Sequence, residues 1–340
     1  MSAEKYMQYY YDINDASFGP GLIASAGHRH KAQRKMLNPV FTVKHMKSRN
    51  WRSEINTEHV IQTETFYLIA EDMKKAMIKD LGGAQSKELD MLRWCSATAL
   101  ELIGTAGIGH SFGTLQGVDS EYSRVIESFF PALAQVSPLR AMFPLIYRAG
   151  PAWLQRKLAG WAPSTNVRKI KNIVDVQDKQ AQDILIRKKE ALKDRQASNN
   201  THDIMSVLVR ADMEANREDR LPENQLLGQM NTLIFAGHEK TSGALSRTLQ
   251  LLAFHPALQN RLRAELQEAP DALSYNELNA LPYLDALCRE VYTVGSRGAS
   301  LSLGKIELGS LGVLAVVTQG IFRGILPQVM SETTAIVGLK

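Results

Sequence analysis

Cysteine is scarce in this sequence. The 340 residues contain two, Cys95 and Cys288, and neither belongs to a Cys-x-x-Cys pair. This excludes a disulfide-stapled fold and gives no zinc-ligand pattern. Long apolar runs are also missing: the nearest, residues 311–326, is interrupted by Gln319 and Arg323 and does not predict a membrane-spanning helix. The N-terminus has no basic stretch followed by an apolar run, so we expect no signal peptide there.

Charge of one sign is not in large excess either. Charged residues make up 22% of the chain and hydrophobic residues 44%, which is typical of a soluble globular protein. The net charge is +5, but the basic residues are scattered along the chain, which argues against a nucleic-acid partner. The length suffices for one large domain or two ordinary ones.

Helical spacing of apolar residues dominates from residue 28 to residue 290 and predicts a mainly α fold. The longest pattern starts at Pro222 and stops at His255-Pro256, where proline begins a new helix. Ser274 and Glu277 have the spacing of a capping box. The predicted helices cover residues 28–37, 58–83, 88–109, 163–195, 222–254, 256–269 and 274–290.

Residues 291–320 differ from the rest of the chain. They hold six glycines and three charged residues, and they show neither strand alternation nor a helix face. A natural surface loop is one interpretation. A structureless loop of this length inside a compact domain is unusual, so an inserted segment is the other.

Two short patterns suggest binding sites. In a helix over residues 28–37, His30 and Arg34 lie one turn apart, where they could grip a carboxylate or phosphate. The alternative is a basic, solvated helix. In the longest predicted helix, Ala236-Gly237 removes side-chain bulk, which suits either the close approach of a flat ligand or plain helix packing.

The order of three segments carries a resemblance. "FGPGL…GHRHKAQRKMLNPVF" (18–41), "LIFAGHEKTS" (233–242) and "LPYLDALCRE" (281–290) resemble the cytochrome P450 superfamily, most of all its fungal microsomal enzymes, over residues 14–290. The resemblance implies a helical fold with minor sheets around a buried haem. It implies a monooxygenase that oxidises a small apolar organic substrate with O2 and with electrons that NADPH supplies through a cytochrome reductase.

The resemblance also implies where haem would bind. His30 and Arg34 match the pair that binds a haem propionate, and Ala236 and Gly237 match the part of the long helix that crosses the haem where oxygen binds. These four residues are the expected cofactor-binding set.

The expected catalytic residues are Glu239 and Thr241. Glu239 matches the acidic member of the family's proton-delivery pair, and the family's threonine would follow it directly. Lys240 occupies that position here, and Thr241 stands one residue later, about 100° further round a helix. A lysine side chain is charged and only donates hydrogen bonds, so oxygen activation should depart from the family pattern.

Glu290 matches the glutamate of the family's Glu-x-x-Arg ion pair, with an exposed helix-terminal carboxylate as the alternative. Thr293 stands where the arginine is expected. Joining Glu290 directly to Ile321 would restore the motif with Arg323. We therefore expect a partial catalytic domain over residues 1–290, an insertion over 291–320 that reflects a retained intron or a gene-model error, and a resumed segment over 321–340.

The family's axial ligand is a cysteine thiolate in a loop well beyond this motif. The chain stops at Lys340 before such a loop, and neither Cys95 nor Cys288 has its surroundings, so we expect no metal ligand and an inactive chain. The N-terminal sheet region and membrane anchor are expected to be missing as well. The family's location is the cytosolic face of the endoplasmic reticulum membrane, and without an anchor a cytoplasmic location stays open. The alternative function is a non-catalytic helical interaction protein derived from this fold.

Overall fold

The computed structural model describes residues 3–38, 57–82, 87–117, 121–136, 138, 142–147, 150–193, 203–215, 220–270, 273, 277–278 and 280–298, with the backbone alone for residues 57–64, 145–146, 193 and 292–298. Every regular element in these ranges is a helix, which confirms the mainly α fold; the minor sheets that the resemblance implies are not among them. None of the described helices is both long and apolar enough to cross a bilayer.

The chain divides into two compact units. The first comprises Met1–Val40, Gly107–His110 and Asp119–Ala236, and the second comprises Phe41–Ala106, Ser111–Val118 and Gly237–Lys340. The helices of the first unit are α1 (Ala3–Phe18), η1 (Leu22–Ala24), α2 (Gly27–Leu37), α6 (Glu121–Glu127), α7 (Phe129–Gln135), α8 (Phe143–Tyr147), α9 (Ala152–Trp161), α10 (Thr165–Lys193), α12 (Ile204–Glu214) and the first part of α13 (Glu223–Phe254).

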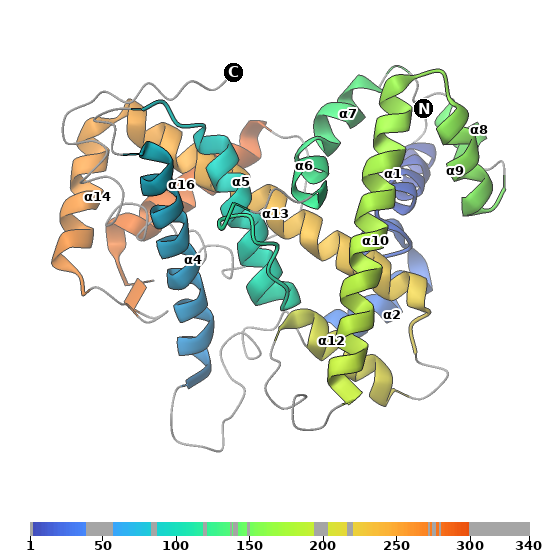
Figure 1. The fold of residues 1–340 in the computed structure, drawn as a ribbon, viewed down its shortest axis with the longest axis horizontal. Helices are drawn as coiled ribbons and strands as arrows, with labels where there is room; N and C mark the ends of the chain where they lie inside the picture. The colour runs from blue at the N-terminus through green and yellow to red at the C-terminus, as the bar shows by residue number, and fades with distance from the viewer. Residues whose placement is uncertain are drawn as a thin grey trace. The chain divides into compact units, whose positions relative to one another are not determined.

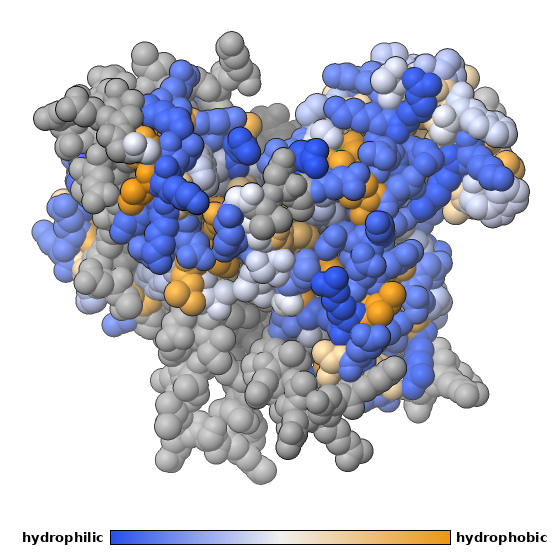
Figure 2. All heavy atoms as spheres, in the orientation of Figure 1, coloured by the Kyte–Doolittle hydropathy of each residue, from blue (hydrophilic) through white to orange (hydrophobic). Residues whose placement is uncertain are grey.

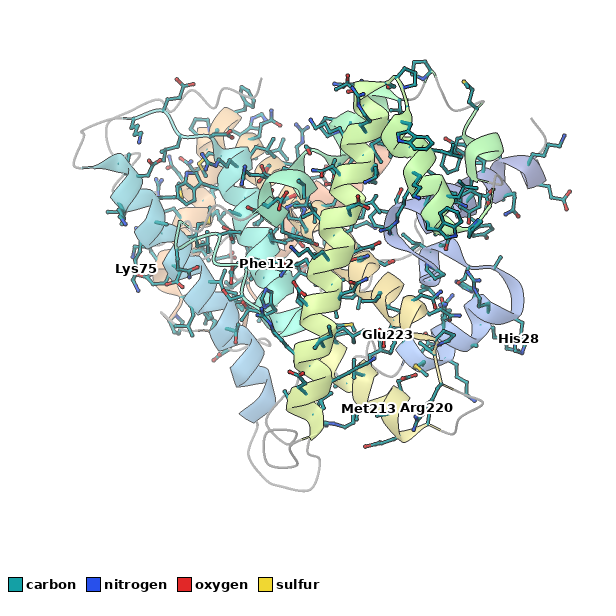
Figure 3. All side chains as sticks on the ribbon, turned by 45° about the vertical axis from the view of Figure 1, so that its right-hand side comes forward. His28, Lys75, Phe112, Met213, Arg220 and Glu223 are labelled. Atoms are coloured by element: carbon teal, nitrogen blue, oxygen red, sulfur yellow. The ribbon has the colours of Figure 1, made fainter. Side chains whose placement is uncertain are left out.

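Helix α10 lies at the centre of the helix packing in the first unit. It packs against α1, α6, α7, α9 and α12 (Figure 1). Its sequence predicts a charged surface helix, and its visible face is mostly hydrophilic (Figure 2). A buried apolar stripe that includes Ile173 and Leu185 holds it to its neighbours. Lys189 pairs with Glu223 at 2.6 Å and so links α10 to the start of α13, where Figure 3 labels Glu223.

Three phenylalanine rings form the centre of the first unit. Phe18 ends α1, Phe129 begins α7 and Phe235 belongs to α13. The ring centroid of Phe18 lies 5.3 Å from that of Phe129 and 4.4 Å from that of Phe235. The cluster therefore brings α1, α7 and α13 together immediately before Ala236.

The loop after Phe18 lies directly on the backbone of α13. A Cβ atom built on Gly21 would stand 2.6 Å from the Gly228 carbonyl oxygen, and one built on Gly228 would stand 2.6 Å from the Gly21 nitrogen. Leu22 N–H donates to Gln229 Oε1 at 3.2 Å. Only glycine permits so close a backbone approach at both positions.

The second unit is a separate apolar core. Its elements are α4 (Thr57–Leu81), α5 (Met91–Leu102), most of the π-helix η2 (Ile103–Ile108), the rest of α13, α14 (Pro256–Glu268) and α16 (Pro282–Gly298). The Asp90 side chain caps α5 by accepting from Arg93 N–H. Buried residues from all its α-helices meet in one cluster that includes Met73, Cys95, Leu245, Leu262 and Cys288.

The side chain of Glu265 of α14 caps the start of helix α16, because it accepts hydrogen bonds from backbone N–H groups in the first turn of α16. The two Glu265 carboxylate oxygens accept from Tyr283 N–H at 2.8 Å and from Leu284 N–H at 2.9 Å. The helix passes Glu290 and continues to Gly298, so the expectation of no helix after residue 290 is wrong for residues 291–298. Helix propagation costs little once a start is fixed, no proline intervenes, and Val291 is buried. Ser274 of the predicted capping box lies outside the described residues.

Candidate functional site

Helix α2 presents the predicted anion-binding pair. The helix covers Gly27–Leu37, which confirms the sequence prediction, and it begins where Gly27 adopts a φ of +60°. His30 is half-buried and Arg34 is exposed one turn later. The helix contains no acidic residue, and Figure 3 shows His28 directed away from the ribbon at its first turn. Both predicted side chains are therefore accessible to an anion and have no carboxylate competitor on their own helix.

The glycine of the predicted notch in α13 serves helix packing. A Cβ atom on Gly237 would stand 2.7 Å from Cγ1 and Cδ1 of Ile103, the first residue of η2. Of the two explanations for Ala236-Gly237, packing accounts for Gly237. Ala236 is exposed, so the small side chain that remains accessible is the alanine.

The three residues after the notch differ in their surroundings. Glu239 and Lys240 are exposed and Thr241 is half-buried. Partial burial raises the pKa of the Glu239 carboxyl and lowers the pKa of the Lys240 ammonium group. Both shifts favour the neutral forms. A carboxyl that retains its proton more readily suits a proton donor, whereas the Lys240 side chain offers only donors where the family has a hydroxyl.

His238 is a residue that the sequence analysis missed. Its side chain is 4% exposed, and its Nε2 lies 2.8 Å from Ser96 Oγ of α5. Desolvation lowers its pKa to about 4, and a hydrogen bond with the Ser96 backbone opposes the shift in part. The buried imidazole is therefore neutral at physiological pH. No local signal distinguishes it, because its partner is 142 residues away in the sequence.

Only Glu290 of the predicted Glu290–Arg323 ion pair lies among the described residues. Glu290 is exposed on α16, and the described residues give it no ion-pair partner. Arg323 lies outside the described residues. His30, Arg34 and Ala236 belong to the first unit, whereas Gly237, Glu239, Thr241 and Glu290 belong to the second.

Comparison with known proteins decides the family. The sequence model of the family Cytochrome P450 matches residues 2–292. The chain belongs to this family. It is 39% identical over 285 residues to Cytochrome P450 monooxygenase 81 of Postia placenta and 38% identical over 295 residues to Ganoderic acid synthetase CYP5150L8 of Ganoderma lucidum. Each match covers 82% of this chain but 50% and 51% of the respective relative, so the chain spans about half their length.

Haem is the group that the cytochrome P450 family implies, and the described residues fit one part of it. The accessible side chains of His30 and Arg34, an imidazole and a guanidinium, fit a propionate. The cysteines do not fit the iron. Both are buried in the core of the second unit, and desolvation raises the pKa of Cys95 and of Cys288 to about 12. A buried neutral thiol is a poor iron ligand, and the described residues contain no cluster of metal-binding side chains.

The buried imidazole of His238 predicts a pH-dependent stability. Free histidine titrates near 6.5, so between that pH and about 4 the unfolded chain binds a proton that the folded chain does not. The contribution to stability is complete above pH 6.5 and falls as the pH drops through this window, by about 3 kcal/mol in total. We expect urea unfolding between pH 7 and pH 4.5 to show a shallower loss of stability for His238→Gln than for the unsubstituted chain. Parallel curves would contradict a neutral, buried His238.

Proposed function

We propose that the complete protein is a haem-dependent monooxygenase that inserts one oxygen atom into a small apolar organic substrate. O2 is the oxidant, and an NADPH-dependent cytochrome reductase supplies the electrons. The observation that carries the proposal is the family match over residues 2–292, together with relatives whose names describe cytochrome P450 monooxygenases. The proposed location is the cytosolic face of the endoplasmic reticulum membrane.

The proposed roles of the side chains follow from their accessibility. His30 and Arg34 bind a haem propionate, and the exposed Ala236 gives the haem room beside α13. Glu239, whose pKa is raised by partial burial, is the proposed proton donor of the pair. Thr241 supplies the hydroxyl of the pair from its half-buried position, and Lys240 changes the hydrogen bonding between them. When bound, haem would supply the oxygen chemistry.

We further propose that the 340-residue chain itself does not form the thiolate-ligated haem. The reason is the state of its two cysteines, which are buried and held as neutral thiols by desolvation. Without a thiolate, the electron donation that favours O–O cleavage is missing. A non-catalytic interaction protein remains the alternative, and the two inaccessible cysteines favour it for the chain in this form.

Carbon monoxide binding tests the proposal about the cysteines. We expect the purified chain, incubated with haem, reduced and exposed to carbon monoxide, to show no thiolate-type Soret band. The variants Cys95→Ala and Cys288→Ala serve as controls and should give the spectrum of the unsubstituted chain. A thiolate-type band that disappears in either variant would contradict the proposal.

Residues 291–320 are proposed to be an insertion that separates Glu290 from Arg323. Two observations support it: the family match ends at residue 292, and removal of the segment restores Glu-x-x-Arg. The helical residues 291–298 fit either origin, because α16 simply continues into them. We expect mature transcripts to join codon 290 to codon 321. Sequencing across this junction decides the point, and thirty intervening codons in every transcript would refute the insertion.

A further inference from the structure

One buried glutamine lies between the two predicted propionate ligands in the sequence. Gln33 follows His30 by three residues and directly precedes Arg34. Its side chain is 0% exposed, although glutamine is mostly a surface residue. A fully buried amide is retained only where its polar atoms are satisfied, so its partners indicate what it does.

The partners of Gln33 come from three other places in the first unit. Its Nε2 donates to the Pro20 carbonyl oxygen at 3.0 Å and to Gln225 Oε1 of α13 at 2.8 Å. Its Oε1 accepts from Ser25 Oγ at 3.1 Å. The Gln33 side chain therefore joins α2 to the loop after Phe18, to the end of η1 and to α13.

No side-chain cap anchors the start of α2. Its N-cap residue is Ala26, which forms no side-chain hydrogen bond there. The buried contacts of this helix are made by Gln33 and Leu37, since every other residue of α2 is half-buried or exposed. Gln33 provides the directional contacts, because hydrogen bonds fix orientation and a leucine contact does not.

The helix geometry links the orientation of Gln33 to that of His30 and Arg34. In an α-helix, His30 lies about 60° and Arg34 about 100° round the axis from Gln33, in the same sense. When Gln33 points inward to Gln225, both His30 and Arg34 are directed to one flank of α2. Rotation of α2 about its axis would move both away together.

We propose that Gln33 is a positioning residue for haem propionate binding. By fixing the rotation of α2 on α13, it determines where the side chains of His30 and Arg34 meet the carboxylate. This inference rests on the proposed function, since it assumes that these two residues bind a propionate. Gln33 itself makes no contact with the ligand.

Iron-free protoporphyrin IX and its dimethyl ester test the proposal without requiring an iron ligand. They differ only at the two propionates, which are carboxylates in the first and methyl esters in the second, so a change between variants in the ratio of their dissociation constants reports on the propionate contact. We expect the unsubstituted chain to prefer the free acid by about tenfold or more, the range of a charge-assisted hydrogen bond. In Gln33→Leu the preference should fall to about threefold or less, because the side chain keeps its bulk but loses its hydrogen bonds.

Two further variants separate positioning from folding. Gln225→Leu removes the hydrogen-bond partner of Gln33 on α13 without changing the sequence of α2. It should also reduce the preference for the free acid. Gln177→Leu makes the same chemical change at a glutamine of α10 that is 1% exposed, and should retain it. Circular dichroism melts of each variant establish whether it folds, and only folded variants are compared.

The outcomes distinguish this inference from the proposed function. If the unsubstituted chain binds acid and ester equally, the propionate role of His30 and Arg34 is wrong and the inference falls with it. If the unsubstituted chain prefers the acid and folded Gln33→Leu and Gln225→Leu both keep that preference, Gln33 does not position His30 and Arg34 and the proposed function stands.

Discussion

The backbone contact between Gly21 and Gly228 is the constraint on which the first unit depends. At this point two segments approach too closely for any side chain on either, and the atoms that a Cβ would meet are backbone atoms that cannot rotate away. The contact fixes the loop that follows Phe18, and that loop leads into η1 and α2. The position of α2 is therefore set from the first two turns of α13, and its Gln33 is 192 residues away in the sequence from its partner Gln225.

Hydrogen bonds add direction to this contact. The side chain of Gln229 accepts a hydrogen bond from the first N–H group of η1, and the side chain of Gln225 accepts one from the Gln33 amide of α2. The part of α13 that faces the loop after Phe18 is thus a narrow, polar strip, which consists of Gln225, Gly228 and Gln229. Further along α13, Phe235 packs against Phe18 of α1, so the contact between the two segments extends to the residue before Ala236. Helix α2 packs against η1 and α12, whereas the amide contacts with α13 specify its orientation, which is what the proposed propionate site requires.

The sequence predicted the long helices well and the decisive contacts poorly. Apolar periodicity and the Pro222 and His255-Pro256 boundaries located α13, because those signals are local. Gln33 and His238 could not be recognised, since a glutamine or histidine in a helix normally indicates a surface, and here burial depends on partners 192 and 142 residues away. The close approach of Gly237 to Ile103, the first residue of the π-helix, is equally non-local.

The most direct test of this account is amide hydrogen exchange in α2 after Gly228→Ala, compared with Gly243→Ala in the same helix. A Cβ on Gly243 meets no atom within 4 Å, so that variant controls for the helix preference of alanine. We predict that Gly228→Ala releases α2 and abolishes the protection of its amides from exchange, while Gly243→Ala leaves it unchanged. Equal protection of α2 in both variants would contradict the central role of the glycine contact.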